Sequence, residues 1–570
     1  MSNAPNVNNL RLFGLAFCIG AIALLAVSRS SAAPAFVVAA DASASPFPAS
    51  SPAYDVTEKS VAELEADLAQ RKVTAEELTR LYLARIEALD VQGPALRSII
   101  ALNPHALDEA RRSDRDRALG KTRGPLDGIP VLIKDNIESA DGTATTAGSA
   151  ALARNVTHRD APLVARLRSA GAIVLGKTNL SEWANVRSAF SISGWSRLGG
   201  LVKNPYSLDR NACGSSSGTG AAVAASLAAV GVGTETDGSI TCPAASNGLV
   251  GLKPTVGLVS RTYVIPVSHH QDTPGPLGRN VADVAALLTA IAGSDARDPA
   301  TAAADAHKQD YVLALRHASL QGKRLGVLRY AAAPLNPAVN AVFNRAVALL
   351  RDQGAQIVEI SDFKPNPALG DAELTVLLAD LKADLNAYLA STPANVKTRT
   401  LAAVIAFNRA DPSELRLFGQ ELFEKANATK GTSTPQYLRA LQTCLRSTRS
   451  EGIDRLLARG RLDALIAPSY GAAWRSDVVD GDNASGVIAS LPAVAGYPHL
   501  TVPMGYVTGL PVGISFVGGA WSEAKLLALG AAYERAAHAR RPPGYVGSIE
   551  RTPGIVPLLE PSNSERAPTL

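Results

Sequence analysis

Apolar runs of strand length alternate along this chain with stretches in which apolar residues recur at helical spacing. The first helical stretch begins with the T-x-x-E pattern of Thr74 and Glu77, which is typical of a helix N-terminus. Leu78, Tyr82 and Ile86 then follow on one face. Strand-like runs and further helical stretches come later: VLI at 131–133, a helix near 161–169, AIVL at 172–175, LGVL at 325–328, a helix from about 337 to 354, IVEI at 357–360 and ALIA at 464–467. The alternation predicts an α/β fold, in which helices cover both faces of a large mixed or mostly parallel β-sheet.

The N-terminal segment has a different pattern. Arg11 precedes an uncharged apolar stretch of 16 residues, Leu12 to Val27, and a segment rich in Ala, Ser and Pro follows. This order is typical of a secretory signal peptide, and the apolar stretch is shorter than the roughly 20 residues of a membrane-spanning helix. We therefore expect a signal peptide and small-residue leader over 1–44, and a periplasmic or secreted protein that does not stay in the membrane. The alternative is an uncleaved N-terminal anchor.

No repeat, linker or low-complexity segment interrupts the pattern after residue 54. We expect a linker over 45–56, a single domain over 57–548 and a C-terminal tail over 549–570. The stretch from about 365 to 460 is predicted to be mainly helical and carries no cluster of candidate residues. Hydrophobic residues make up 46% of the 570 residues, which is typical of a globular protein with a large core. The net charge is +5 and basic pairs such as Arg540–Arg541 form no stripe that could follow a phosphate backbone, so nucleic acid is not an expected partner.

Three cysteines remain after the leader, which contains Cys18. Three is an odd number, so at least one of Cys213, Cys242 and Cys444 stays unpaired within a monomer. We expect no disulfide framework to hold the large core together. We interpret Cys213 and Cys242 as small buried packing residues, because no histidine or other base lies near either in the sequence.

Candidate chemistry lies at three positions. Ser215, in CGSSSGTG, and Ser239, in GTETDGSITCP, are 24 positions apart, and Lys134 ends the apolar run GIPVLIK. That run predicts burial of Lys134. Burial lowers the pKa of a lysine from its ordinary value of about 10.4, so that a neutral amine can accept a proton near pH 7. Alternatively, Lys134 pairs with Asp135 or extends to water at the end of a strand.

The loop around Ser215 has other interpretations. A small-residue loop before an Ala-rich helix offers free N–H groups, but it lacks the Gly-Lys-Ser/Thr ending of a nucleotide phosphate site. Gly214 to Gly218 also match the G-x-S-x-G nucleophile elbow, with Ser216 at its centre and His499 or His538 as a partner. The upstream segment NPYSLDRNAC is too polar for the core strand that an elbow requires, which argues against this alternative.

These stretches and several others resemble the amidase signature family of serine hydrolases. The resemblance extends over about 55–545 and includes LDGIPVLIKDNI, GKTNLSEWA, NPYSLDRNACGSSSG, GTETDGSITCPAASNGLVGLKPTVGLVSR, AGYPHLTVPMG and LPVGISF. The runs TETDGSI, SEWAN, SISGWS and FGQEL are most similar to the branch of bacterial peptide amidases, which hydrolyse the C-terminal amide of peptides. The resemblance implies the amidase signature fold, with a large mixed sheet between helices, and a single catalytic domain.

The resemblance also implies roles for the three candidate residues. Lys134 matches the family's base, Ser215 its bridging serine, which follows a cis peptide bond, and Ser239 its acyl-accepting nucleophile. In such a relay, neutral Lys134 takes a proton from Ser215, which takes one from Ser239, and no histidine is needed. The family's oxyanion hole of backbone N–H groups falls on Thr236, Asp237, Gly238 and Ser239.

Some positions depart from the usual pattern of the family. The family more often has glycine where Asp237 stands and arginine where Thr241 stands. Within the glycine-rich loop of the family, this chain has Cys213 and Ser217. An Asp237 carboxylate that points into the oxyanion hole weakens it; alternatively, this residue serves only as a turn or cap. Ser216 and Ser217 either bind substrate or simply form the loop.

The resemblance implies a cofactor-free amidase that acts on a short peptide amide or another small amide. Alternatives within the family are an amidase of aryl or fatty amides and the A-type subunit of a tRNA-dependent amidotransferase, against which the leader argues. A non-catalytic binding homologue is the third class, but all three catalytic positions are filled.

The adjacent pair His269 and His270 does not predict a metal site. Chain neighbours rarely face one ion, and no carboxylate or cysteine accompanies them at ligand spacing.

Overall fold

The computed structural model describes residues 54–486 and 488–559. The expected leader, most of the expected linker and the end of the expected tail therefore lie outside the described residues. Within this range, buried side chains extend from Val56 to Ile549, which are 3% and 8% exposed. No helix in the same range is both long enough and apolar enough to cross a membrane.

Eleven strands of the described domain form one sheet: β1 (Ile99–Leu102), β2 (Pro130–Lys134), β3 (Ile173–Thr178), β8 (Val230–Glu235), β9 (Val250–Lys253), β10 (Thr273–Gly278), β11 (Arg324–Leu328), β12 (Gln356–Ile360), β13 (Ala464–Pro468), β14 (His499–Val507) and β15 (Leu510–Val517). Their order is β1-β3-β2-β8-β10-β9-β14-β15-β13-β11-β12. β2 pairs in parallel with β3 and β8, and β11 pairs in parallel with β12 and β13, whereas the other neighbours are antiparallel. The large mixed sheet confirms the predicted fold class.

Two short hairpins and many helices surround this sheet. The hairpins are β4 (Trp195–Ser196) with β5 (Gly200–Leu201), and β6 (Lys203–Asn204) with β7 (Ser207–Asn211). The α-helices of the described residues are α1 (Val61–Ala69), α2 (Ala75–Ile86), α3 (Ala106–Ala118), α4 (Pro162–Ser169), α5 (Ser217–Ala224), α6 (Thr241–Ser246), α7 (Val281–Ile291), α8 (Ala304–His307), α9 (Arg329–Ala332), α10 (Pro337–Asp352), α11 (Leu369–Ala390), α12 (Leu401–Ala410), α13 (Glu421–Ala428), α14 (Pro435–Thr448), α15 (Asp454–Gly460), α16 (Ser490–Ala495), α17 (Glu523–Ala537) and α18 (Val556–Leu559).

The elements expected from the apolar pattern are present. α2 begins after Thr74, whose hydroxyl accepts a hydrogen bond from the Glu77 N–H at 3.0 Å. α10 ends just before Gly354, which adopts a φ of +89° that glycine tolerates without strain. The strands β2, β3, β11, β12 and β13 cover the apolar runs predicted as strands.

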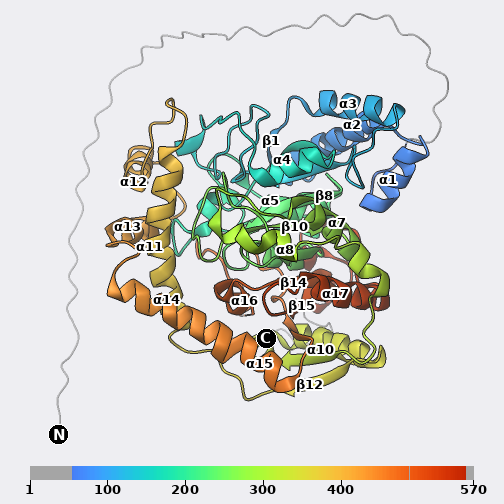
Figure 1. Cartoon of the computed structure of the whole chain (residues 1–570), viewed down its shortest axis with the longest axis vertical. Helices are drawn as coiled ribbons and strands as arrows, with labels where there is room; N and C mark the ends of the chain where they lie inside the picture. Colours follow the sequence, from blue (N-terminus) through green and yellow to red (C-terminus); the bar gives the residue numbers. More distant parts are fainter. Residues whose placement is uncertain (1–53, 487, 560–570) are drawn as a thin grey trace, which may run out of the picture. The chain divides into compact units, whose positions relative to one another are not determined.

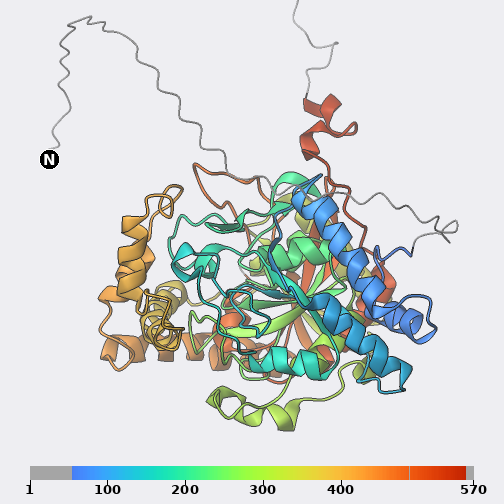
Figure 2. The same ribbon diagram turned by 90° about the horizontal axis from the view of Figure 1, so that it is seen from above.

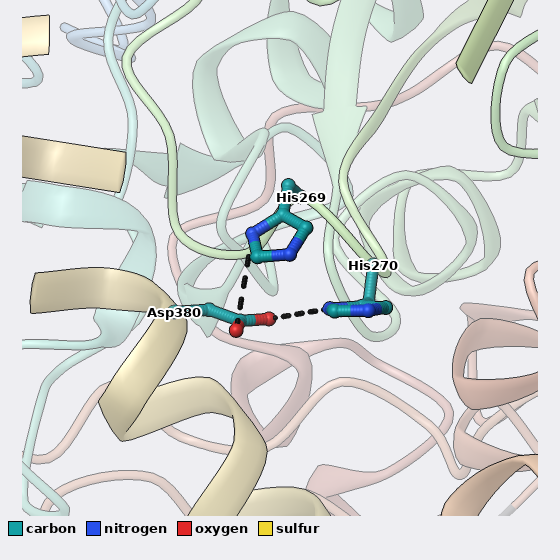
Figure 3. A group of neighbouring side chains, drawn as sticks. All are labelled: His269, His270 and Asp380. Carbon is teal, nitrogen blue, oxygen red and sulfur yellow. Dashed lines mark hydrogen bonds and ion pairs between the residues drawn. The ribbon is translucent and has the colours of Figure 1, made fainter. Parts of the chain in front are cut away.

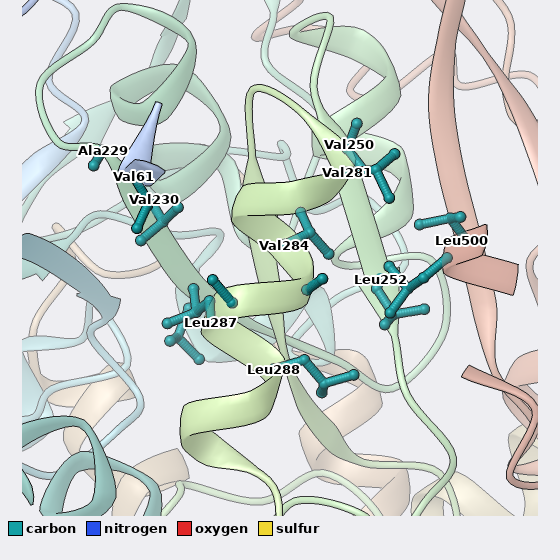
Figure 4. Close-up of a cluster of buried hydrophobic side chains, with 14 of the residues drawn as sticks. Val61, Ala229, Val230, Val250, Leu252, Val281, Val284, Leu287, Leu288 and Leu500 are labelled. Atoms are coloured by element: carbon teal, nitrogen blue, oxygen red, sulfur yellow. The ribbon is translucent and has the colours of Figure 1, made fainter. Parts of the chain in front are cut away.

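The two faces of β8 show how helices cover the sheet. Val230 and Val232 point into the largest apolar cluster, where α7 packs against side chains of β8, β9 and β14 (Figure 4). Gly231 and Gly233 point to the other face, because successive side chains of a strand alternate. A Cβ at either glycine would lie 2.7 Å from a side chain in the segment that forms the start of α5, Thr219 for Gly231 and Ser216 for Gly233. The glycines therefore allow this segment to lie directly on the sheet.

The segment from about 365 to 460 is mainly helical, as predicted. In both views, α11 to α14 lie together along one side of the domain (Figure 1 and Figure 2). Contacts join α11 to α12, α13 and α14.

Candidate active site

Neighbouring elements of the sheet bring the candidate residues together. Lys134 is the last residue of β2, which lies beside β8 in parallel. Ser215 lies in the loop that enters α5, and Ser239 lies in the turn between β8 and α6. The Ser216 N–H donates to the Ser239 carbonyl oxygen at 3.2 Å, so the two serine segments are joined directly.

Lys134 is fully buried, as its apolar run predicts. Its Nζ donates to Ser215 Oγ at 2.8 Å and to Thr234 Oγ1 at 3.0 Å. Burial lowers the pKa of Lys134 to about 7, although the charges of Asp272 and Glu235 act in the opposite direction. A substantial fraction of this lysine is therefore neutral near pH 7 and able to accept a proton.

Two other lysines of the described chain are also fully buried, Lys177 and Lys253. Lys177 Nζ donates to the Ile137 carbonyl oxygen and Lys253 Nζ to that of Pro254, each at 3.0 Å. Both lysines end apolar runs in the sequence, as Lys134 does, so the pattern alone does not distinguish the three. Of these three buried lysines, Lys134 alone donates to a serine hydroxyl.

The loop before α5 presents Ser215 to Lys134. The Gly214–Ser215 peptide bond is cis, as the family resemblance implies, and the Ser215 carbonyl oxygen accepts from the Ser181 N–H at 3.0 Å. A Cβ at Gly214 would lie 2.2 Å from Ser181 Oγ, which explains why glycine stands there. Ser215 itself is fully buried.

The turn between β8 and α6 carries Ser239, whose exposed fraction is 8%. Gly238 precedes it with a φ of +79°, a conformation that favours glycine. A Cβ at Gly238 would also lie 2.2 Å from Tyr470 Oη. Conformation and packing therefore both require glycine beside Ser239.

The same turn leaves a group of backbone donors free. The N–H groups of residues 236–239 donate to no backbone carbonyl of the described chain. The N–H groups of Ile240 and Thr241, in contrast, donate to Glu235 Oε2 at 2.8 and 2.9 Å. The four free N–H groups can bind negative charge on a substrate oxygen, as the expected oxyanion hole requires.

Asp237 lies in this turn and is partly exposed. Its Oδ2 accepts a hydrogen bond from Ser490 Oγ at 2.6 Å, so its carboxyl group is bonded to the start of α16. Although the residue is partly exposed, removal of its carboxyl group from water raises the pKa of Asp237 above its ordinary value.

The hydroxyl of Ser216 is used within the protein. Ser216 Oγ donates to the Thr234 carbonyl oxygen at 3.0 Å and accepts from the Thr234 N–H at 3.2 Å. Ser217 is fully buried, and its Oγ has no hydrogen-bond partner among the described residues. His499 Nε2 lies 2.6 Å from Ser515 Oγ, so this histidine does not serve Ser216 as the nucleophile-elbow alternative requires.

Cys213 and Cys242 form a disulfide bond, so their interpretation as simple packing residues is wrong. The bond joins Cα atoms 5.9 Å apart across a sequence separation of 29. The loop that it closes contains both Ser215 and Ser239. Separation in the sequence conceals this pairing, because β8 and the turns around it bring the two cysteines together. Cys444 stays a buried free thiol, as the odd number requires.

A cavity of about 450 Å³ adjoins the site. Thr234 and Thr236, on either side of Glu235, line it together with residues 261–267 and side chains of α11. The cavity therefore extends from the turn that carries Ser239 toward α11.

Comparison with known proteins places this geometry in a family. The sequence profile of the amidase family matches residues 77–527. A probable amidase of Arabidopsis thaliana is 39% identical in an alignment of 505 positions that covers 86% of this chain and 93% of the relative. This chain belongs to the amidase signature family.

Solved structures of family members agree with this assignment. The crystal structure of peptide amidase from Stenotrophomonas maltophilia is 50% identical in sequence, with a TM-score of 0.80 over 86% of this chain and 99% of that chain. Among sequence relatives, the A-type subunit of the glutamyl-tRNA(Gln) amidotransferase of Symbiobacterium thermophilum is 35% identical over 82% of this chain and 98% of its own length. The chain is thus an amidase signature hydrolase that acts on carbon–nitrogen bonds of amides, and its fold is close to that of peptide amidase.

Proposed function

We propose that Ser239 attacks the substrate carbonyl as it passes its proton to Ser215, and that Ser215 passes its own proton to neutral Lys134. The observation that carries this proposal is the 2.8 Å contact between Lys134 Nζ and Ser215 Oγ, both fully buried. The lowered pKa of Lys134 supports it, because only a neutral amine accepts a proton.

The position of Ser239 supports the second step of the relay. The bond from the Ser216 N–H to the Ser239 carbonyl oxygen holds the two serine segments side by side. No hydrogen bond among the described residues joins the hydroxyls of Ser215 and Ser239 directly. The support for proton transfer between them is therefore the contact between their backbone segments.

Attack forms a bond between Ser239 Oγ and the carbonyl carbon, and negative charge moves to the carbonyl oxygen. The free N–H groups of residues 236–239 bind that oxygen, and each donor contributes about 3 kcal/mol to the transition state. The carbon–nitrogen bond then breaks, and the departing nitrogen receives the proton back from Lys134 through Ser215. Water attacks the acyl group by the same relay, and Ser239 recovers its proton as the acid leaves.

We propose C-terminally amidated peptides as the substrates and ammonia as the leaving group. The similarity to peptide amidase supports this class of substrate. A second structure of that enzyme, 51% identical with a TM-score of 0.81, is a complex with the competitive inhibitor chymostatin. Other small, aryl or fatty amides are the alternatives within the same chemistry.

The A-type amidotransferase subunit is a second candidate, because relatives with that name are 35% identical over most of their length. The Cys213–Cys242 disulfide argues against it, since disulfides form mainly in oxidising compartments and that subunit works inside the cell.

The same disulfide supports our proposal that the protein is exported. Sequencing of the N-terminus of the mature protein tests export, and we expect the first residue to lie beyond the leader. Cytosolic protein that still begins with Met1 contradicts export.

Turnover of four substrates tests the proposed specificity: it is measured as ammonia for an amidated peptide, a fatty amide and a primary aryl amide, and as new primary amine for an internal peptide bond. We expect rapid release from an amidated peptide, slow release from a fatty amide, and no cleavage of an internal peptide bond or an aryl amide. A Ser239→Ala variant measures the background. Faster turnover of the aryl or fatty amide than of the amidated peptide overturns the proposed substrate and leaves the relay intact.

A further inference from the structure

Two histidines flank a buried carboxylate outside the serine–lysine relay (Figure 3). His269 and His270 lie in the loop before β10, and Asp380 lies on α11, 110 residues after His270. His270 Nδ1 lies 2.9 Å from Asp380 Oδ2, and His269 Nδ1 lies 3.8 Å from Asp380 Oδ1. Both imidazoles therefore direct a ring nitrogen toward one carboxylate.

A second carboxylate completes the group. Asp384 follows Asp380 by four positions on α11, which places both on the same helix face. Asp384 Oδ2 lies 2.9 Å from His269 Nδ1. The Asp380 side chain has no exposure, whereas those of His269 and Asp384 are 44% and 21% exposed, so the group is open to solvent on one side.

Neighbouring side chains hold Asp380 in place. Ser268 Oγ donates to its Oδ2 and Tyr437 Oη to its Oδ1, each at 2.7 Å. Arg261 is the neighbouring cation, and its guanidinium donates to the His269 carbonyl oxygen. Hydrogen-bond partners of this kind fix the orientation of ligands at metal sites.

The nitrogen–oxygen separations in this group are close to those around a tetrahedral ion, and the candidate ligand atoms of His269, His270 and Asp380 all lie within 4.8 Å of one another. Zinc bonds to nitrogen and oxygen of about 2.0 to 2.2 Å imply ligand atoms about 3.3 to 3.6 Å apart. The separations between the imidazole nitrogens and the carboxylate oxygens, 2.9 to 3.8 Å, bracket that range. Without an ion, a proton on each Nδ1 occupies the space between nitrogen and carboxylate.

We propose that the two histidines and the two α11 carboxylates bind a divalent transition-metal ion of the zinc class. Imidazole nitrogen and carboxylate oxygen are both ligands of such ions, and the two carboxylates supply charge that balances the cation. Binding displaces the Nδ1 proton of each imidazole, and each ring then binds as the neutral tautomer protonated at Nε2. The adjacent histidines do not predict this site because their carboxylate partners are distant in the sequence, and folding supplies both from α11.

The site also has an open path. His269 and Asp384 line the cavity that extends to Thr234 and Thr236. A bound ion therefore lies on the wall of the cavity that adjoins the turn carrying Ser239.

Titration of the untagged, chelator-treated protein with Co²⁺ tests the proposal, because tetrahedral Co²⁺ has strong visible absorption and reports on a zinc site. We expect the bands to saturate at one equivalent and to disappear when Zn²⁺ is added. The His269→Gln/His270→Gln variant should bind Co²⁺ at least about 10-fold more weakly. A His105→Gln/His317→Gln variant is the matched control, because both of these histidines are exposed and lie elsewhere, and it should bind as the parent does.

Two results overturn the proposal: no visible bands in the parent at saturating Co²⁺, or equal binding by the parent and the His269→Gln/His270→Gln variant. Asp380→Asn is a second test that keeps the shape of the side chain and its contact with Tyr437. It should lose the Co²⁺ bands while its far-ultraviolet circular dichroism matches the parent. Retention of the full bands in this variant also overturns the proposal.

Discussion

Lys134 Nζ donates a 2.8 Å hydrogen bond to Ser215 Oγ in a position that solvent does not reach. The bond connects the end of β2 to the loop that enters α5. Burial lowers the pKa of Lys134 to about 7, so this hydrogen bond joins a serine hydroxyl to an amine that is partly neutral at physiological pH.

The rate of amide hydrolysis should rise with pH through about 7. Only neutral Lys134 accepts a proton, and its lowered pKa places the neutral form above that pH. We expect kcat/KM, measured as ammonia release, to increase about tenfold per pH unit below pH 6 and to level off above pH 8. Lys134→Ala should lower turnover by orders of magnitude, and a variant with a near-parental rate contradicts the role of base.

The same lysine should lower the stability of the fold. The pKa of Lys134 is about 7 in the folded protein against an ordinary value of 10.5, so the unfolded chain binds more protons between these values and stability rises with pH there. At pH 7 the difference corresponds to roughly 4 kcal/mol. Lys134→Met removes the buried charge at similar length.

Chemical denaturation of Lys134→Met at pH 7 should therefore give a higher free energy of unfolding, by up to about 4 kcal/mol. The increase in the free energy of unfolding that Lys134 causes between pH 7 and pH 10.5 should disappear as well. A variant no more stable than the parent shows that the buried charge is not destabilising.

The Cys213–Cys242 disulfide should stabilise the fold around both serines. In the chain-entropy model, a cross-link over a loop of this size contributes about 3 to 4 kcal/mol. We expect Cys213→Ser/Cys242→Ser to lower the free energy of unfolding by that amount in urea denaturation. Cys444→Ser is the control for loss of a buried sulfur without a cross-link, and it should change stability much less. Equal midpoints for the double variant and the parent contradict the expectation.

Gly238→Ala should reduce activity through a contact with Tyr470. The added Cβ would lie 2.2 Å from Tyr470 Oη, so the turn that carries Ser239 must move. Gly238→Ala/Tyr470→Phe removes the hydroxyl and should recover part of kcat, while strain at positive φ remains. Tyr470→Phe alone is the control. If the double variant is no faster than Gly238→Ala, Tyr470 is not the cause of the loss.

Features fixed by neighbouring residues in the chain were predictable from the sequence. The run GIPVLIK places Lys134 at the end of a buried strand, and the periodicity after Thr74 defines a helix with its cap. Both follow from local patterns of apolar and polar residues. The proposed roles of Ser215 and Ser239 rest on the family resemblance, because a small-residue loop has several physical interpretations.

Features that depend on contacts between distant segments were not predictable in this way. The pairing of Cys213 with Cys242 requires the chain to return along β8, and the meeting of His270 with Asp380 requires α11 to pack against the loop before β10. The same limit applies to Asp237, whose partner Ser490 lies 253 residues away.

Peptide mapping by mass spectrometry after labelling with a serine-directed phosphonate tests most directly the central claim that Ser239 is the nucleophile. We predict a single label on Ser239 in the parent and no label on the Ser239→Ala variant. A label on Ser215 or Ser216, or persistent labelling of Ser239→Ala, contradicts Ser239 as the nucleophile.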